Sequence, residues 1–128
     1  MKFPRFLLAM SAFTLAATST GAIAHPKLVS SNPAANSTVK KPTSITLTFN
    51  EKLIAAAAKV DLTMTSMPGM GGHKPMKVTG FKSSVAADGK TLVLSLPRPL
   101  PAGGYKLDWH AVGGDTHPIH GGLTFNVR

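Results

Sequence analysis

The chain has no cysteine and few acidic or aromatic residues, and these shortages narrow the classes of protein to which it can belong. Its 128 residues include one tryptophan, one tyrosine and five aspartates and glutamates in total. Without cysteine the fold cannot use disulfides, and no thiol is open to oxidation. Beyond residue 24 nothing resembles the run of about 20 apolar residues that a membrane-spanning helix needs. We therefore expect a mature protein that is not inserted in a membrane.

Residues 1–24 have the three parts of an export signal. A basic start is followed by an apolar stretch of 12 residues (6–17) and by a small, polar exit that ends in Ala22-Ile23-Ala24. The apolar stretch is shorter than the roughly 20 residues that span a bilayer as a helix. Small residues at this spacing are typical of a signal-peptidase site, so we expect cleavage after Ala24. An uncleaved membrane anchor is the alternative.

Cleavage would leave a short, basic domain over residues 25–128. Its 104 residues correspond to one domain. Removal of Lys2 and Arg5 leaves 12 basic residues against five acidic ones, a net charge of +7. Such an excess can indicate nucleic-acid binding. Because the chain is exported and its lysines are scattered singly, we expect a solvated basic surface and no nucleic-acid partner.

Short segments in which apolar and polar residues alternate make up most of the mature domain. This alternation predicts half-buried β-strands, at residues 45–49, 60–64, 92–96, 105–111 and 123–127. Residues 28–29 and 78–81 could add two strands, and residues 53–58 one helical turn. Proline, glycine and asparagine separate the segments, as in β-rich domains. We predict an all-β fold, a Greek-key β-barrel or sandwich of about seven strands.

Cleavage after Ala24 would make His25 the first residue, where an α-amine and a ring nitrogen can chelate one metal ion. Pro26 has no amide N–H, which closes the backbone-amide route of copper binding, so further ligands must come from elsewhere. Asp115 and His117 lie two apart in a glycine-flanked loop, and extended backbone would point both to one side. Two imidazoles, an amine and a carboxylate favour Cu(II) or Ni(II). The alternative is a solvated loop.

A second group of candidate ligands lies in one glycine- and proline-rich segment, and comprises Met64, Met67, Met70, His73 and Met76. The prolines and glycines exclude a buried helical stripe. Thioethers are soft ligands that select Cu(I). Met64 ends a predicted strand and could instead be a core residue. A flexible protein-contact surface is the other interpretation of this segment.

Three further residues are weaker candidates. Glu51 follows the 45–49 strand and is either an outer-sphere partner or weak ligand of the metal, or a solvated strand end. His110 alternates in phase with Lys106 and Asp108, which predicts a place on the outer face of its strand. We expect His110 and His120 to be bystanders rather than ligands.

These motifs together resemble the CopC family of periplasmic copper-binding, copper-resistance proteins. The resemblance covers residues 25–128 and rests on His25-Pro26-Lys27-Leu28, Phe49-Asn50-Glu51, Met67-Pro68-Gly69-Met70, Tyr105-Lys106-Leu107-Asp108-Trp109 and Asp115-Thr116-His117-Pro118-Ile119. One departure is His110, where the family more often has arginine.

The resemblance implies a small Greek-key β-barrel with a copper site at each end. It assigns Cu(II) to His25, Asp115 and His117 with Glu51 close by, and Cu(I) to the methionine-rich segment. It also implies a periplasmic location, with other periplasmic or inner-membrane copper-handling proteins as partners.

The function that we predict is a copper carrier that is not an enzyme. A histidine-brace copper monooxygenase is one alternative, although a single tryptophan and a single tyrosine suit a polysaccharide surface poorly. An exported interaction module is another, but it would explain neither candidate metal site.

Overall fold

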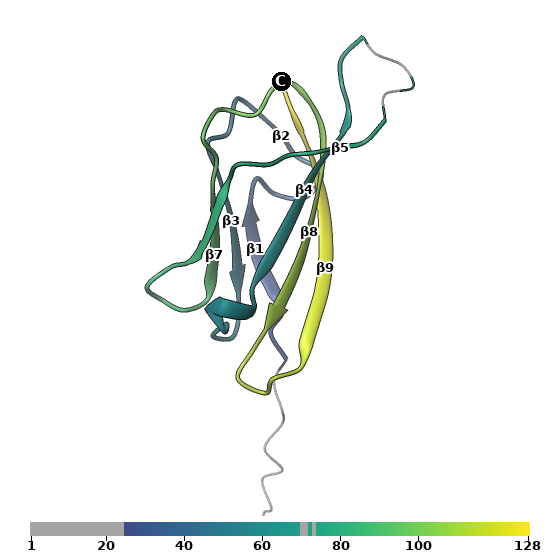
Figure 1. Cartoon of the computed structure of the whole chain (residues 1–128). Coiled ribbons are helices and arrows are strands. Elements are labelled where there is room, and N and C mark those ends of the chain that lie inside the picture. The colour runs from purple at the N-terminus through teal and green to yellow at the C-terminus, as the bar shows by residue number, and fades with distance from the viewer. Residues whose placement is uncertain (1–24, 70–71, 73) are drawn as a thin grey trace, which may run out of the picture.

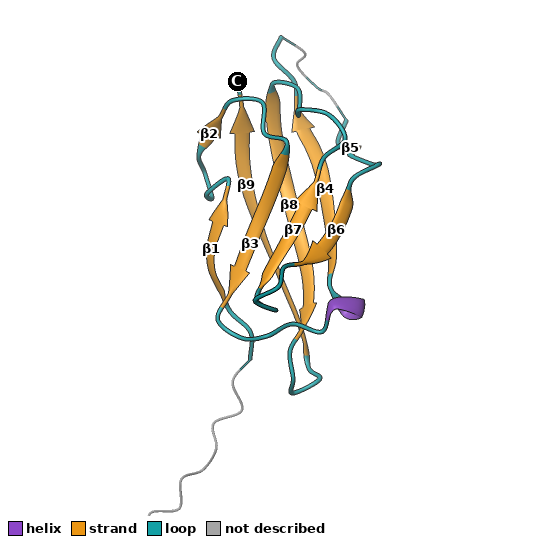
Figure 2. Ribbon diagram, turned by 90° about the vertical axis from the view of Figure 1, so that its left-hand side faces the viewer, coloured by secondary structure: helices purple, strands orange, loops and turns teal. Residues whose placement is uncertain are grey.

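The protein is a β-sandwich of two antiparallel-dominated sheets, seen in a computed structural model that describes residues 25–69, 72 and 74–128. The four-stranded sheet has the order β1 (Leu28–Asn32), β3 (Ser44–Phe49), β7 (Thr91–Ser95) and β6 (Lys82–Val85). The five-stranded sheet has the order β2 (Thr38–Val39), β9 (Pro118–Val127), β8 (Gly103–Val112), β4 (Lys59–Ser66) and β5 (Met76–Lys77). In Figure 2 the four-stranded sheet lies in front of the five-stranded sheet.

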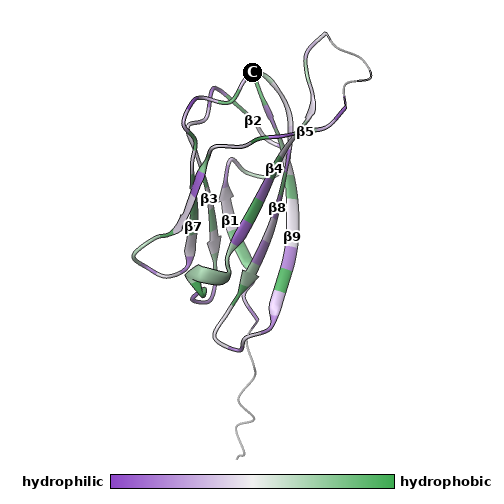
Figure 3. Ribbon diagram, in the orientation of Figure 1, coloured by the Kyte–Doolittle hydropathy of each residue, from purple (hydrophilic) through white to green (hydrophobic). Residues whose placement is uncertain are grey.

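Alternation along the strands builds the core between these layers. Ile45, Leu47 and Phe49 of β3 are at most 1% exposed, and Leu107 of β8 and Phe125 of β9 are equally buried. Colours for hydrophobic and hydrophilic residues accordingly change along β4 and β9 in Figure 3. The all-β prediction is confirmed in its sandwich form, since the sheets are two hydrogen-bonded layers and not one closed barrel.

The strand predictions are confirmed for the segments with clear alternation, but the sequence does not locate the shortest strands. All five alternating segments form strands, and residues 28–29 begin β1. Residues 78–81 instead connect β5 to β6. The two-residue strand β2 was not predicted, because it exists only through its parallel pairing with β9. The helical turn near residue 55 is a 3-10 helix over Ala55–Ala57.

The β8–β9 hairpin places the Asp115 loop at one end of the sandwich. Ten cross-strand pairs run from Gly103–Val127 to Val112–Pro118, and residues 113–117 close the hairpin. Gly121 lies opposite Trp109, whose ring occupies the place where a side chain at 121 would be. This long register fixes the loop at the end of the five-stranded sheet.

The loops that carry candidate metal ligands lie at opposite ends of the described molecule. In Figure 1 the β8–β9 loop lies at the lower end, where the described chain begins, and the β4–β5 connection lies at the upper end. Within the described ranges, no helix has the length and apolar character required to cross a bilayer.

Candidate metal centre

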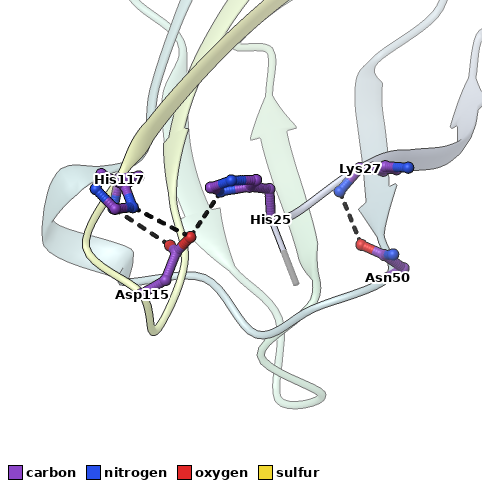
Figure 4. Close-up of polar contacts among 5 residues, drawn as sticks. All are labelled: His25, Lys27, Asn50, Asp115 and His117. Atoms are coloured by element: carbon purple, nitrogen blue, oxygen red, sulfur yellow. Dashed lines mark hydrogen bonds and ion pairs between the residues drawn. The ribbon is translucent and has the colours of Figure 1, made fainter. Parts of the chain in front are cut away.

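His25, Asp115 and His117 converge where the start of the domain meets the β8–β9 loop (Figure 4). Nδ1 of His25 is 2.7 Å from Asp115 Oδ2, and Nδ1 of His117 is 3.6 Å from the same oxygen. One ligand atom from each residue lies within 4.8 Å of the others. The structure therefore brings together residues that are 90 positions apart in the sequence.

The carboxylate of Asp115 is the centre of this group. Its side chain is only 9% exposed, and Oδ1 accepts a hydrogen bond of 3.2 Å from the backbone N–H of His117. Oδ2 is buried, and the two imidazole Nδ1 atoms at 2.7 Å and 3.6 Å are the polar groups that face it. A buried carboxylate oxygen on which two imidazole nitrogens converge fits a bound cation.

The electrostatics keep Asp115 ionised. Desolvation by burial raises the pKa of Asp115. The hydrogen bond from the His117 N–H and the charges of His25 and His117 lower this pKa, and together they outweigh the effect of burial. The net result is a pKa below the ordinary aspartate value. The side chain is therefore a carboxylate at neutral pH, as metal binding requires.

Pro26 and Gly113 set the position of His25. Pro26 is buried against Gly113, and a Cβ at 113 would lie 2.6 Å from Pro26 Cγ. The loop itself turns through a hydrogen bond of 3.0 Å from the Thr116 N–H to the Gly113 carbonyl, with Thr116 at a φ of 66°. The absence of a side chain at 113 therefore lets the first residues of the domain pack on the loop that carries Asp115.

Asn50 fixes the same segment from the other side (Figure 4). Its side-chain Oδ1 accepts a hydrogen bond of 2.7 Å from the Lys27 N–H, and its own N–H donates to the Lys27 carbonyl at 3.0 Å. The sequence indicates the next residue, Glu51, and not this role of Asn50. The place of Asn50 within the Phe49-Asn50-Glu51 motif is the signal that points to it.

Glu51 itself is partly buried and is not among the three residues that the structure gathers. The imidazoles of His25 and His117 meet edge to face, with ring centroids 5.7 Å apart. Their side chains are 52% and 67% exposed. The group is thus open to solvent on its histidine side and closed behind Asp115.

The methionine-rich segment divides into core and surface residues. Met64 is 4% exposed and belongs to the core of β4, whereas Met76, its cross-strand partner on β5, is 50% exposed. Met67 is partly buried and packs against the core. Met70 and His73 lie outside the described residues. Met67 and Met76 are therefore the candidate ligands of this segment whose positions the structure gives.

The comparisons with known proteins agree on one family. The profile of the CopC domain matches residues 28–128. Copper resistance protein C of Xanthomonas campestris pv. juglandis is 47% identical over 86% of this chain and 85% of its own length. Copper resistance protein C of Escherichia coli is 49% identical over 84% of each chain.

Solved structures give the same result. The crystal structure of PcoC, described as a methionine rich copper resistance protein from Escherichia coli, is 47% identical with a TM-score of 0.74, over 82% of this chain and 100% of that one. CopC from Methylosinus trichosporium OB3b is 25% identical with a TM-score of 0.65, over 80% and 93%. The Xanthomonas campestris and Escherichia coli relatives are named as copper resistance proteins, and neither is named as an enzyme. Because the family profile covers residues 28–128 and these relatives are similar over most of their length, this chain belongs to the CopC family.

Proposed function

We propose that this chain is a periplasmic copper carrier that serves copper resistance and holds Cu(II) and Cu(I) at separate ends of one sandwich. Cleavage after Ala24 frees the α-amine of His25. Cu(II) is then bound by this amine and by His25, Asp115 and His117. No chemistry on an organic substrate is required, because the metal ion is the cargo.

The observation that carries the Cu(II) site is the convergence of two imidazole Nδ1 atoms on the buried Oδ2 of Asp115. The orientation of His25 supports the amine ligand. Nδ1 is the ring nitrogen nearer the backbone, so Nδ1 and the α-amine can close a six-membered chelate ring on one ion. Nitrogen and carboxylate ligands in this number suit tetragonal Cu(II).

The Cu(I) site is formed by Met67, Met70, His73 and Met76. Support comes from composition, since every methionine after residue 24 lies between positions 64 and 76. It also comes from Met76, a large apolar side chain that is half exposed on a short edge strand. Thioethers prefer Cu(I), whereas imidazole and carboxylate ligands suit Cu(II), so ligand chemistry separates the two oxidation states. Glu51 acts near the Cu(II) end as an outer-sphere partner or weak ligand.

Two forms of the protein test the role of the α-amine. One begins at His25 and the other retains Ala24, so that only the free amine at His25 is lost. We expect the longer form to bind Cu(II) much more weakly and to bind Cu(I) with unchanged affinity. Electron paramagnetic resonance with one equivalent of Cu(II) counts the nitrogen ligands of each form.

Equal Cu(II) affinity and identical spectra for both forms would exclude the amine ligand. Mass spectrometry of the exported protein checks the cleavage site separately. The same samples distinguish a carrier from a monooxygenase. Added polysaccharide should speed the consumption of peroxide by a reduced monooxygenase, but it should not change the rate for a reduced copper carrier.

A further inference from the structure

Two histidines outside the metal centre form a close pair on the outer face of the five-stranded sheet. His110 of β8 and His120 of β9 are direct cross-strand partners. Their Nδ1 atoms are 3.1 Å apart, and their ring centroids are 4.4 Å apart at 66°. His110 is half-buried and His120 is exposed. The pairing joins two residues that sequence reasoning treated as separate bystanders.

The pair borders a hollow of about 330 Å³ that is lined by Lys59, Asp61, Asp108, Trp109, His110 and His120. Two carboxylates and one ammonium group make its lining acidic in a chain whose formal net charge is +9. Lys106 and Lys77 lie 3.8 Å and 3.9 Å from Asp108 and Asp61 and offset part of this charge. These ion pairs are exposed and weak, so both carboxylates can exchange partners.

The spacing of the two nitrogens matches a metal ion. Imidazole nitrogens bind divalent metals at about 2.0–2.1 Å. Two such ligands at an angle between about 90° and 109° have their nitrogens about 2.9–3.4 Å apart, since the separation is twice the bond length times the sine of half the angle. The observed 3.1 Å lies inside this range. The distance between the two Nδ1 atoms therefore already suits one ion bound to both.

We propose that His110 and His120 form a second Cu(II) site, in which both imidazoles bind through Nδ1. Water molecules complete the coordination, and Asp61 and Asp108 of the hollow add negative charge near the ion. Among divalent first-row ions, Cu(II) binds most tightly to such nitrogen and oxygen donors. The site is independent of the proposed function of His25, because it uses neither the α-amine nor any residue of the β8–β9 loop.

Titration of a variant that carries both His25→Ala and His117→Ala with Cu(II) isolates this site, because neither imidazole of the metal centre at Asp115 remains. We expect one Cu(II) equivalent with two imidazole nitrogens in its paramagnetic resonance spectrum. His110→Gln and His120→Gln should each abolish that equivalent. Lys59→Gln is the matched control, because Lys59 lines the same hollow but is not a proposed ligand. This variant removes a positive charge near the ion, so it should bind Cu(II) at least as tightly as the parent chain.

Zinc provides a diamagnetic check on the ligand atoms. Addition of Zn(II) to the same protein should shift the Nδ1 resonances of His110 and His120 together in long-range ¹H–¹⁵N spectra. The opposing result is that the two rings only share a hydrogen bond. In that case neither resonance would move and His120→Gln would bind as much Cu(II) as the parent, which overturns the proposal. A failure of the His25 experiment alone leaves both of these readouts unchanged.

Discussion

Gly113 is the residue on which the position of His25 most depends. The ring of Pro26 fills the space where a side chain at 113 would begin, with Cγ 2.6 Å from the ideal Cβ position. Gly114, the next residue, has no heavy atom within 4 Å of its ideal Cβ. Two adjacent glycines in one loop therefore differ completely in what they contact.

This difference gives a matched pair of substitutions. Gly113→Ala should displace Pro26 and move the His25 nitrogen from Asp115, which should weaken Cu(II) binding by about 10- to 100-fold, as loss of a positioning contact does at metal sites. Gly114→Ala should leave the affinity unchanged. Competition titration with a chromophoric chelator measures both.

Thermal unfolding without metal serves as the control for this pair. If Gly113→Ala binds Cu(II) as tightly as Gly114→Ala, the packing of Pro26 does not position His25.

Asp88 organises the turn between β6 and β7. Its Oδ1 accepts hydrogen bonds from the N–H groups of Lys90 and Thr91 at 2.9 Å and 3.0 Å, and its Oδ2 accepts one from the Thr91 hydroxyl at 2.8 Å. The bond from Lys90 and the Thr91 hydroxyl lower the pKa of Asp88 below the ordinary value. The turn thus depends on an ionised carboxylate.

The consequence is a dependence of stability on pH. Because the pKa is lower in the folded state, ionised Asp88 stabilises the fold fully above the unfolded pKa, and this stabilisation is lost as the pH falls through the folded pKa. Asp88→Ala should therefore lower the free energy of unfolding at pH 7 and lower it less near pH 2. Urea unfolding at the two pH values measures the difference.

Asp61→Ala is the comparison variant, because the side chain of Asp61 is 71% exposed and makes only a distant ion pair with Lys77. It should change stability little. An equal loss for Asp88→Ala at both pH values would show that the carboxylate charge does not matter.

The separation of the two ends is a property of the whole molecule. Two sheets packed around one core place the Asp115 loop and the β4–β5 connection at opposite ends (Figure 1). Since the ends share no ligand residue, we expect copper at one end to leave the coordination at the other unchanged.

The double variant Met67→Leu and Met70→Leu tests this separation. It should remove much of the sulfur scattering from the X-ray absorption spectrum of bound Cu(I), while the Cu(II) paramagnetic resonance spectrum stays the same. Met64→Leu is the matched control, because Met64 is buried in β4 and should keep full sulfur ligation. Persistence of full sulfur ligation in the double variant, or its loss in Met64→Leu, would refute this ligand assignment.

The sequence alone determined features that depend on neighbours in the chain. Alternation placed β3, β4, β7, β8 and β9, because successive side chains of a strand point to opposite faces. The two-residue spacing of Asp115 and His117 already indicated a shared direction, and the composition of residues 64–76 indicated a segment with soft ligands.

Only the tertiary structure decided what depends on pairing between distant segments. The strands form two layers and not a closed barrel. His25 lies 2.7 Å from Asp115, and Asn50 accepts a hydrogen bond from the Lys27 N–H. His110 lies beside His120. Each of these contacts follows from strand register and from core packing over many residues. A local pattern fixes which face a side chain is on, but it cannot specify which distant residue lies opposite.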